Sequence, residues 1–225
     1  MLPTWRSLLA FAGMVGIGMW VAAGAWHPFL AVEEGFPAQG DPVDLLCVEG
    51  WSSESAIDAV AEAYRSGQVR RVAVTGGPTQ SREKLIGFST YAALGAYRLE
   101  QRGVPRDRIV VSEPAGVDRR RTLNDILELH RTLERQSIEP ARMQIFSTGV
   151  HTRRTRLLYQ RVFGGAVEIR AQALPPEDYD PRQWWSTSDG LKTVVMETIS
   201  WVYDTVSPMP EIGREKTVNL TAQRS

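Results

Sequence analysis

The chain has 225 residues, with 26 basic and 26 acidic side chains, so its formal net charge is zero. This length suits one large domain better than two, and the charge balance argues against a general nucleic-acid binder, which normally carries a basic excess. Cys47 is the one cysteine of the sequence. A single cysteine excludes an internal disulfide framework and a multi-cysteine metal site, and the apolar neighbours of Cys47 predict a small buried core residue.

The first expected element is an apolar helix at residues 8–26, which contain no charged side chain. About twenty apolar residues can span a bilayer, and Arg6 before the segment favours a cytoplasmic N-terminus with the rest of the chain translocated. Residues 23–25, all small, also fit the cleavage site of a signal peptide, which would give a secreted periplasmic protein. We predict residues 1–26 to be a signal anchor in the inner membrane. A cytoplasmic nucleotide-binding protein is the alternative if this prediction fails.

Residues 27–42 are rich in proline and glycine and read as a linker before a domain at 43–206. In that domain apolar, strand-like runs alternate with segments of helical periodicity. Strands are predicted at 43–48, 69–75, 108–111, 143–148 and 167–171, with helices between them and a last helix at about 191–206. This alternation predicts a Rossmann-like three-layer α/β/α sandwich with a mostly parallel sheet of about five strands, preceded by one transmembrane helix. The polar tail, 207–225, is predicted to be flexible.

Ligands of such folds bind outside the carboxyl ends of the strands, so the residues that follow each strand are the candidate site. These residues include Glu49, Thr75, Gly76, Gly77 and Gly149. Glu49 can accept a sugar hydroxyl, act as a base or pair with an arginine. The two glycines after the second strand permit a sharp turn and close approach to a ligand, or simply form an ordinary turn.

The segment GVHTRRTRLLY at 149–159 places a histidine and several arginines where the fourth strand gives way to a helix. The N-terminus of a helix offers unpaired N–H groups and partial positive charge, so arginines there favour an anion site. His151 is the candidate general acid or base or a phosphate ligand; the alternative is a helix cap. Arg153 and Arg154 lie nearest the helix start and are the candidate ligand-binding arginines, whereas Arg161 is expected at the surface.

A second basic cluster, residues 119–121, precedes the helix that begins near Thr122. If both helix starts lie at one sheet edge, Arg121 and Thr122 face the same cleft as His151. A solvated turn is the alternative. His130 falls on the apolar side of its helix and is expected to be a semi-buried structural histidine.

Three further candidate residues lie toward the C-terminus: Trp184, Trp185 and Glu197. Trp184 and Trp185 can stack on a sugar, lie at a membrane interface or cover the core, and core cover is preferred. Glu197 is expected to bind an arginine from the core side. No HExxH, cysteine pair, Walker A or GxSxG motif occurs, so no metal site is predicted and a serine triad is disfavoured. The sequence does not identify a cofactor.

Six blocks occur in order along the domain: VEGW (48–51), TGGP (75–78), YAALGA (91–96), DRRRT (118–122), GVHTRRTRLLY (149–159) and DYDPRQWW (178–185). Together they resemble the bacterial DUF218 proteins, also called the YdcF/SanA/ElyC-like family, over roughly residues 43–206. The resemblance implies a Rossmann-like domain behind one membrane helix and a role in the cell envelope.

Two functions follow as hypotheses. The first is a membrane-anchored envelope enzyme, a transferase or hydrolase, acting on an anionic nucleotide- or lipid-linked saccharide in polysaccharide or peptidoglycan metabolism. In that case His151 or Glu49 moves a proton, and arginines hold the phosphate. The alternative is a non-catalytic module that binds envelope glycans or partner proteins. An enzyme requires His151 and a carboxylate within reach of one bound atom.

Overall fold

The structure is a computed structural model that describes residues 5–36, 42–79, 87–117 and 119–210. Within helix α1 the side chains of residues 6–10, 12, 17 and 19 lie outside the description. The predicted flexible tail falls largely on residues 211–225, outside the described residues.

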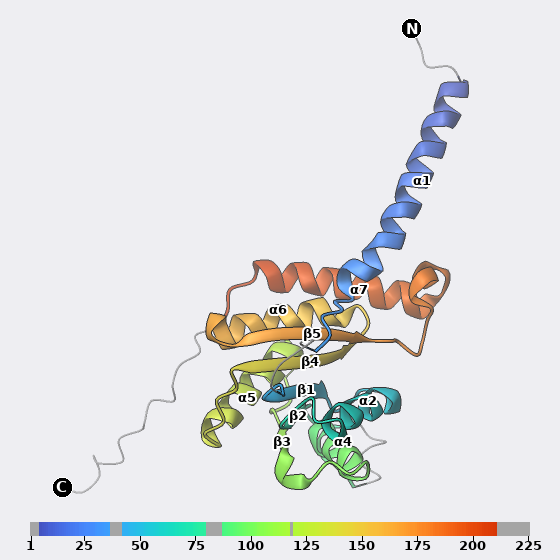
Figure 1. Cartoon of the computed structure of the whole chain (residues 1–225). Helices are drawn as coiled ribbons and strands as arrows, with labels where there is room; N and C mark the ends of the chain where they lie inside the picture. Colours follow the sequence, from blue (N-terminus) through green and yellow to red (C-terminus); the bar gives the residue numbers. More distant parts are fainter. Residues whose placement is uncertain (1–4, 37–41, 80–86, 118, 211–225) are drawn as a thin grey trace, which may run out of the picture.

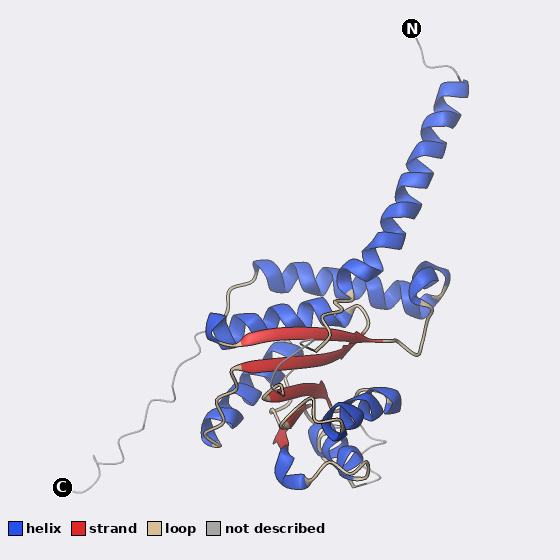
Figure 2. Ribbon diagram, viewed as in Figure 1, coloured by secondary structure: helices blue, strands red, loops and turns tan. Residues whose placement is uncertain are grey.

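A parallel sheet of five strands forms the centre of the molecule, in the order β3-β2-β1-β4-β5 (Figure 1). The strands are β1 (Leu45–Glu49), β2 (Val72–Thr75), β3 (Ile109–Ser112), β4 (Arg142–Thr148) and β5 (Glu168–Leu174). The helices are α1 (Trp5–Leu30), α2 (Glu54–Arg65), α4 (Tyr91–Glu100), α5 (Arg121–Arg135), α6 (His151–Phe163) and α7 (Ser188–Val206). Three short 3-10 turns are η1 (Arg106–Arg108), η2 (Gly164–Ala166) and η3 (Pro181–Ser186). The predicted Rossmann-like α/β fold is confirmed (Figure 2).

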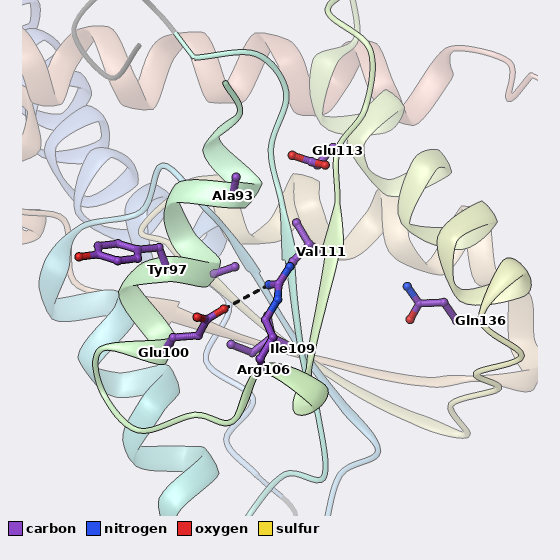
Figure 3. A pocket seen from close by; sticks show the side chains of 9 residues that line it. Ala93, Tyr97, Glu100, Arg106, Ile109, Val111, Glu113 and Gln136 are labelled. Carbon is purple, nitrogen blue, oxygen red and sulfur yellow. Dashed lines mark ion pairs between the residues drawn. The ribbon is translucent and has the colours of Figure 1, made fainter. Parts of the chain in front are cut away.

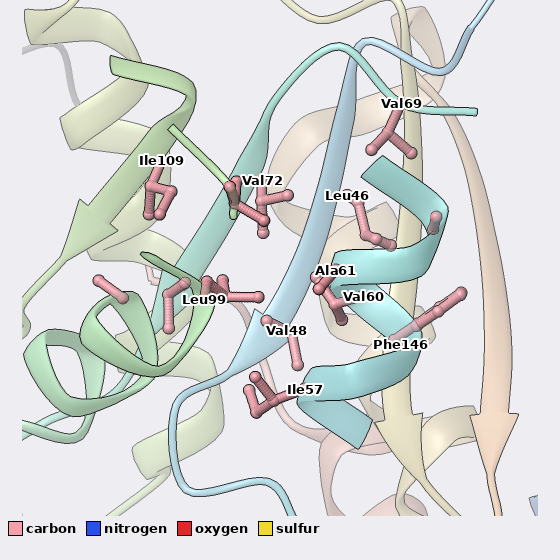
Figure 4. Packing of buried hydrophobic residues seen from close by; sticks show 14 of the residues in the cluster. Leu46, Val48, Ile57, Val60, Ala61, Val69, Val72, Leu99, Ile109 and Phe146 are labelled. Atoms are coloured by element: carbon pink, nitrogen blue, oxygen red, sulfur yellow. The ribbon is translucent and has the colours of Figure 1, made fainter. Parts of the chain in front are cut away.

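Helices cover both faces of the sheet, as the continuous apolar runs of its strands require. In β1, Leu46 and Val48 face α2 and α4, and alternate residues Leu45 and Cys47 face α5 and α6. This alternation follows from the two-residue period of a strand. The α2/α4 side is closed by residues such as Ile57 and Leu99 (Figure 4). Cys47 is fully buried, as predicted.

The starts of the helices differ in a way that matters for the site. Helices α2, α4 and α7 are capped by the hydroxyl groups of Ser53, Thr90 and Thr187, each accepting a hydrogen bond from a backbone N–H of the first turn. Helices α5 and α6 begin without a side-chain cap. The first N–H groups of α5 are therefore left for water or a ligand, whereas at α6 the Thr152 N–H already donates to the Gly149 carbonyl at 3.2 Å.

Helix α1 continues to Leu30, past the boundary predicted at residue 26. Its last turns join the domain, because Leu30 is fully buried and the His27 Nε2 atom lies 3.1 Å from the Tyr179 hydroxyl. Within the part of the chain that the structure describes, no helix is long and apolar enough to cross a membrane. The signal anchor therefore stays a prediction.

Part of the predicted linker runs along the edge of the sheet. The Glu34 N–H donates to the carbonyl of Ala171 at 2.7 Å, and the Ala173 N–H donates to the carbonyl of Val32 at 2.7 Å. This pairing protects the outer edge of β5, which would otherwise expose unpaired backbone groups. Residues 37–41 of the linker lie outside the described residues.

Helix α7 forms an outer layer on α6 and η3. Arg161 of α6 donates to the carbonyl groups of Asp204 and Ser207 and so fastens the end of α7. Arg161 is therefore partly buried, and the prediction that it lies at the surface holds only in part. Trp184 is buried and donates its indole N–H to the Ala23 carbonyl at 3.0 Å, consistent with the covering role preferred for it.

Candidate functional site

The two candidate catalytic residues meet at the middle of the sheet. The chain adds β2 and β3 on one side of β1 and then β4 and β5 on the other, so the topology reverses between β1 and β4. Ligands of open α/β sheets bind in the crevice at such a reversal. Glu49 is the last residue of β1, and His151 opens the helix that follows β4.

A cleft of about 1210 Å³ opens above this point. Its wall includes Gly77 after β2, Arg121 and Thr122 at the start of α5, His151 at the start of α6, and Glu197 of α7. The starts of α5 and α6 therefore line one cleft.

His151 lies between two carboxyl groups. Its Nδ1 atom is 3.0 Å from Oε1 of Glu197, and its Nε2 atom is 3.6 Å from Oε1 of Glu49. Nη2 of Arg154 also lies 3.0 Å from Nδ1. We assign the Nδ1 proton to the bond with Glu197, because a carboxylate can only accept and Arg154 has other acceptors. Nε2 is then the basic nitrogen, directed toward Glu49.

Glu49 is a buried carboxyl group with spare hydrogen-bonding capacity. Only 7% of the residue is exposed, and Oε1 accepts a hydrogen bond from Ser147 at 3.3 Å. Oε2 has no hydrogen-bond partner among the described residues. Burial raises the pKa of Glu49, an effect that the nearby His151 partly offsets. Glu49 does not line the cleft and borders it only through His151. A buried polar atom without a partner is rare in a native protein, so Oε2 of Glu49 is a candidate contact for a ligand that reaches in beside His151.

Glu197 has the opposite protonation behaviour. Burial alone would raise its pKa, but His151 and Arg154 outweigh this effect and lower the pKa to about 2. One imidazole is thus flanked by a carboxylate that stays ionised and by a carboxyl group that tends to keep its proton. Carboxyl groups whose environments separate their pKa values are typical of acid–base sites.

Arg154 lines the cleft, but carboxylates balance its charge. Its Nε atom donates to Oε2 of Glu197 at 2.8 Å, Nη1 donates to the Thr122 hydroxyl at 3.1 Å, and Oδ2 of Asp204 lies 3.5 Å away. The expected pairing of Glu197 with an arginine is confirmed. Arg154 and Thr122 therefore position Glu197 as much as they face a ligand.

The other arginines of α6 point elsewhere, as the helical rotation of successive residues requires. Arg153, a candidate ligand residue, donates to the Phe29 carbonyl and covers the Phe29 ring, with 3.9 Å between guanidinium and ring centre. Arg156 pairs with Glu34 at 2.7 Å. The structure does not bring Arg153 to the cleft.

Around the start of α5 the two arginines also differ. Arg120 has φ of +49° and lies 3.3 Å from Oδ1 of Asp204. Arg121 is exposed at the cleft and forms no ion pair within the part of the chain that the structure describes. It is the cleft arginine best placed to meet an anion.

Asp125 is a cleft residue that the sequence analysis did not single out. Burial, reinforced by the charge of Glu49, raises the pKa of Asp125 to about 7, against a lowering effect of Arg121. The sequence could have indicated Asp125, because it comes four residues after the candidate Arg121 and so lies on the same face of the helix.

The remaining candidates fall into two groups. Gly77 lines the cleft, whereas Thr75, Gly76 and Gly149 do not. Gly76 has φ of +156°, and a Cβ atom there would lie 2.7 Å from Cβ of Tyr91, so this glycine is required for packing. Gly149 has φ of +48° and passes beneath Tyr179, where a Cβ atom would lie 3.3 Å from the hydroxyl.

Among the described residues, no group of three or more His, Cys, Asp and Glu side chains could hold a metal ion. His130 lies outside the cleft, 3.5 Å from Glu134 and packed on the Phe163 ring. Another pocket, of about 520 Å³, lies at the β3 edge, where Arg106 and Glu100 point toward one another 3.4 Å apart (Figure 3). It contains no histidine.

No protein-family model and no curated protein matches this chain. The DUF218 assignment therefore stays a prediction from the sequence blocks. The site itself combines a histidine held between two carboxyl groups with a large cleft that has an exposed aromatic rim: Trp51 is 46% exposed, and its ring meets the His151 ring edge-on at 5.9 Å.

Proposed function

We propose that this chain is a DUF218-like, membrane-anchored enzyme of the bacterial cell envelope. It binds a phosphate-bearing saccharide in the cleft and acts on it as a hydrolase or transferase. The observation that carries the proposal is the placement of His151, with Glu197 at 3.0 Å on one ring nitrogen and Glu49 at 3.6 Å on the other. A histidine far from every carboxylate would have favoured a binding module.

The chemistry assigned to the three residues follows from their surroundings. Glu197 holds the imidazole in one orientation and stabilises its protonated form. Nε2 of His151 takes a proton from an attacking hydroxyl group, and Glu49, which keeps its proton to higher pH than an ordinary glutamate, donates one to the departing oxygen. Both roles require the ligand to lie between β1 and α6.

A phosphate-bearing ligand is supported by the uncapped starts of α5 and α6 and by Arg121. A saccharide is supported by Trp51 at the rim, because an exposed aromatic face stacks on a sugar ring. The envelope location rests on the predicted anchor and on the sequence resemblance.

The test is a turnover assay with the full-length chain in detergent, using a nucleotide-linked sugar and a polyprenyl-phosphate-linked sugar and detecting products by mass spectrometry. We expect His151→Gln to lose about 10²–10⁴-fold in rate. His130→Gln, the matched control outside the cleft, should retain the rate. Binding without turnover by the wild-type protein would contradict the enzyme and favour the glycan-binding module.

A further inference from the structure

Helix α7 presents a long apolar face to the outside of the molecule. The side chains that form this face, each between 43% and 76% exposed, are Leu191, Val195, Met196, Ile199, Val202, Tyr203 and Val206. Positions 191, 195, 199, 202 and 206 recur at helical spacing and form one stripe. A surface helix in water normally shows charged or polar residues on this side.

From Thr193 to the end of α7 the apolar face carries no charge, whereas the exposed Lys192 lies on the same side in the first turns of the helix. Between Thr193 and Val206 the charged residues are Glu197 and Asp204, and both turn inward toward Arg154. Their side chains are only 18% and 5% exposed. The outward side of these turns is therefore uncharged, and continuous exposed apolar surface of this kind marks an interaction site.

The face lies beside the place where α1 leaves the domain. The Trp26 indole N–H donates to the Thr198 hydroxyl at 2.8 Å, and the Phe29 ring meets the Trp201 ring at 5.4 Å. Figure 1 shows α7 running across the base of α1, on the side of the domain from which α1 projects. The apolar face of α7 thus continues toward the surface of α1.

The side chains around this junction suit the boundary between water and lipid. Tryptophan is enriched there because its ring is apolar and its N–H is polar, and the partly buried Trp26 and Trp201 lie at the junction. Beyond it, Phe11 and Trp20 of α1 are 64% and 67% exposed. Lipid would cover both helices without a break between them.

We propose that α7 is an interfacial helix that lies flat on a phospholipid bilayer and buries its apolar face among the headgroups and upper acyl chains. Ile199 and Tyr203 belong both to the apolar face and to the cleft wall, so the cleft opens at the lipid surface. This inference does not rest on the chemistry proposed for the cleft.

The test is a depth measurement by spin labelling of the full-length chain in vesicles of phosphatidylethanolamine and phosphatidylglycerol. Single nitroxide labels are placed by Val195→Cys and Val202→Cys, with Glu62→Cys on α2 as the control, because the Glu62 side chain is 68% exposed. The unsubstituted protein is the labelling blank, since Cys47 is fully buried. Each label is then exposed to oxygen, which partitions into lipid, and to a water-soluble nickel chelate.

We expect the ratio of oxygen to nickel accessibility at Val195 and Val202 to exceed that at Glu62 severalfold. Equal ratios at all three positions would show that the face lies in water and would overturn the proposal. Low accessibility to both reagents, with spin–spin broadening that disappears on dilution with unlabelled protein, would assign the face to a second copy and also overturn it. None of these accessibility measurements requires the protein to convert a substrate.

Discussion

His151 is supported by residues from three separate elements. Glu49 comes from β1, Glu197 from α7 and Arg154 from the next turn of α6, and the latter two are held by one another as well as by the histidine. An imidazole restrained in this way keeps one tautomer and one orientation, which acid–base catalysis requires. The buried charges make this support sensitive to single substitutions.

Glu197→Ala is expected to destabilise the protein by about 3–5 kcal/mol at neutral pH, because it leaves Arg154 buried with reduced compensation. The pKa of Glu197 is lowered from its ordinary value of 4.5 to about 2, so its stabilising contribution is present above pH 4.5 and is lost as the pH falls toward 2. Chemical denaturation across this pH range measures it. The control is Glu62→Ala, whose ion pair with Arg65 is largely exposed and is worth at most about 1 kcal/mol. Equal losses of stability in the two variants would contradict the assignment of Glu197 as the partner that compensates the buried charge of Arg154.

Asp125→Asn is expected to stabilise the protein at pH 8, by on the order of 2 kcal/mol after allowance for solvent around the side chain. The pKa of Asp125 is raised from 3.8 to about 7. The charged form of Asp125 therefore opposes folding, and this effect grows as the pH rises from 4 to 7. The gain in the free energy of unfolding should fade as the pH falls to 4. Asp107→Asn, at a side chain that is 76% exposed, is the control. A gain in stability that does not vary with pH would contradict the interpretation that the charge of Asp125 opposes folding.

At the scale of elements, a close backbone contact sets the position of α4 beside the cleft. A Cβ atom at Gly50 would lie 2.0 Å from the Tyr91 carbonyl oxygen, and one at Gly95 would lie 2.8 Å from Cα of Gly50. The turn after β1 and helix α4 therefore approach as closely as two glycines allow. This contact places Tyr91 in the cleft wall.

Gly95→Ala is accordingly expected to cost about 1–3 kcal/mol, because the added methyl group has no space between α4 and the turn after β1. A thermal denaturation midpoint reports the loss. The control is Gly165→Ala in η2, where a Cβ atom would meet nothing within 4 Å and φ is unexceptional, so little change is expected. A stable Gly95→Ala protein would show that α4 packs more loosely than described.

The strands and helices could be predicted because each carries its own periodicity. The apolar run at 43–48 and the stripe of Leu123, Ile126 and Leu133 need no tertiary information, and they became β1 and α5. The parallel sheet then brought Glu49 and the start of α6 to one edge. The contact of Arg153 with Phe29 depends on the path of α1, which the sequence around Arg153 does not reveal. The pKa of Asp125 is raised by burial, which depends on the tertiary structure and not on the local sequence pattern.

At the scale of the whole molecule, α7 connects the cleft to the outer surface. Its inner side supplies Glu197 to His151, and its outer side is the apolar face. The same helix thus completes the site and, in our proposal, sets its distance from the bilayer. Loss of α7 packing would therefore affect both the site and the attachment of the domain.

The central claim is that the cleft at His151 binds a phosphate-bearing ligand, and a thermal-shift measurement on the full-length chain tests it most directly. The probes are inorganic phosphate, UDP-N-acetylglucosamine and a polyprenyl phosphate, applied to the wild-type protein, His151→Ala, Arg121→Ala and the control His130→Ala. A ligand at one hundred times its Kd stabilises the folded state by about 2.7 kcal/mol, which raises the midpoint by several degrees. We expect that rise in the wild-type protein and in His130→Ala, and a much smaller one in His151→Ala and Arg121→Ala. No rise with any probe, or an equal rise in all four proteins, would contradict the account.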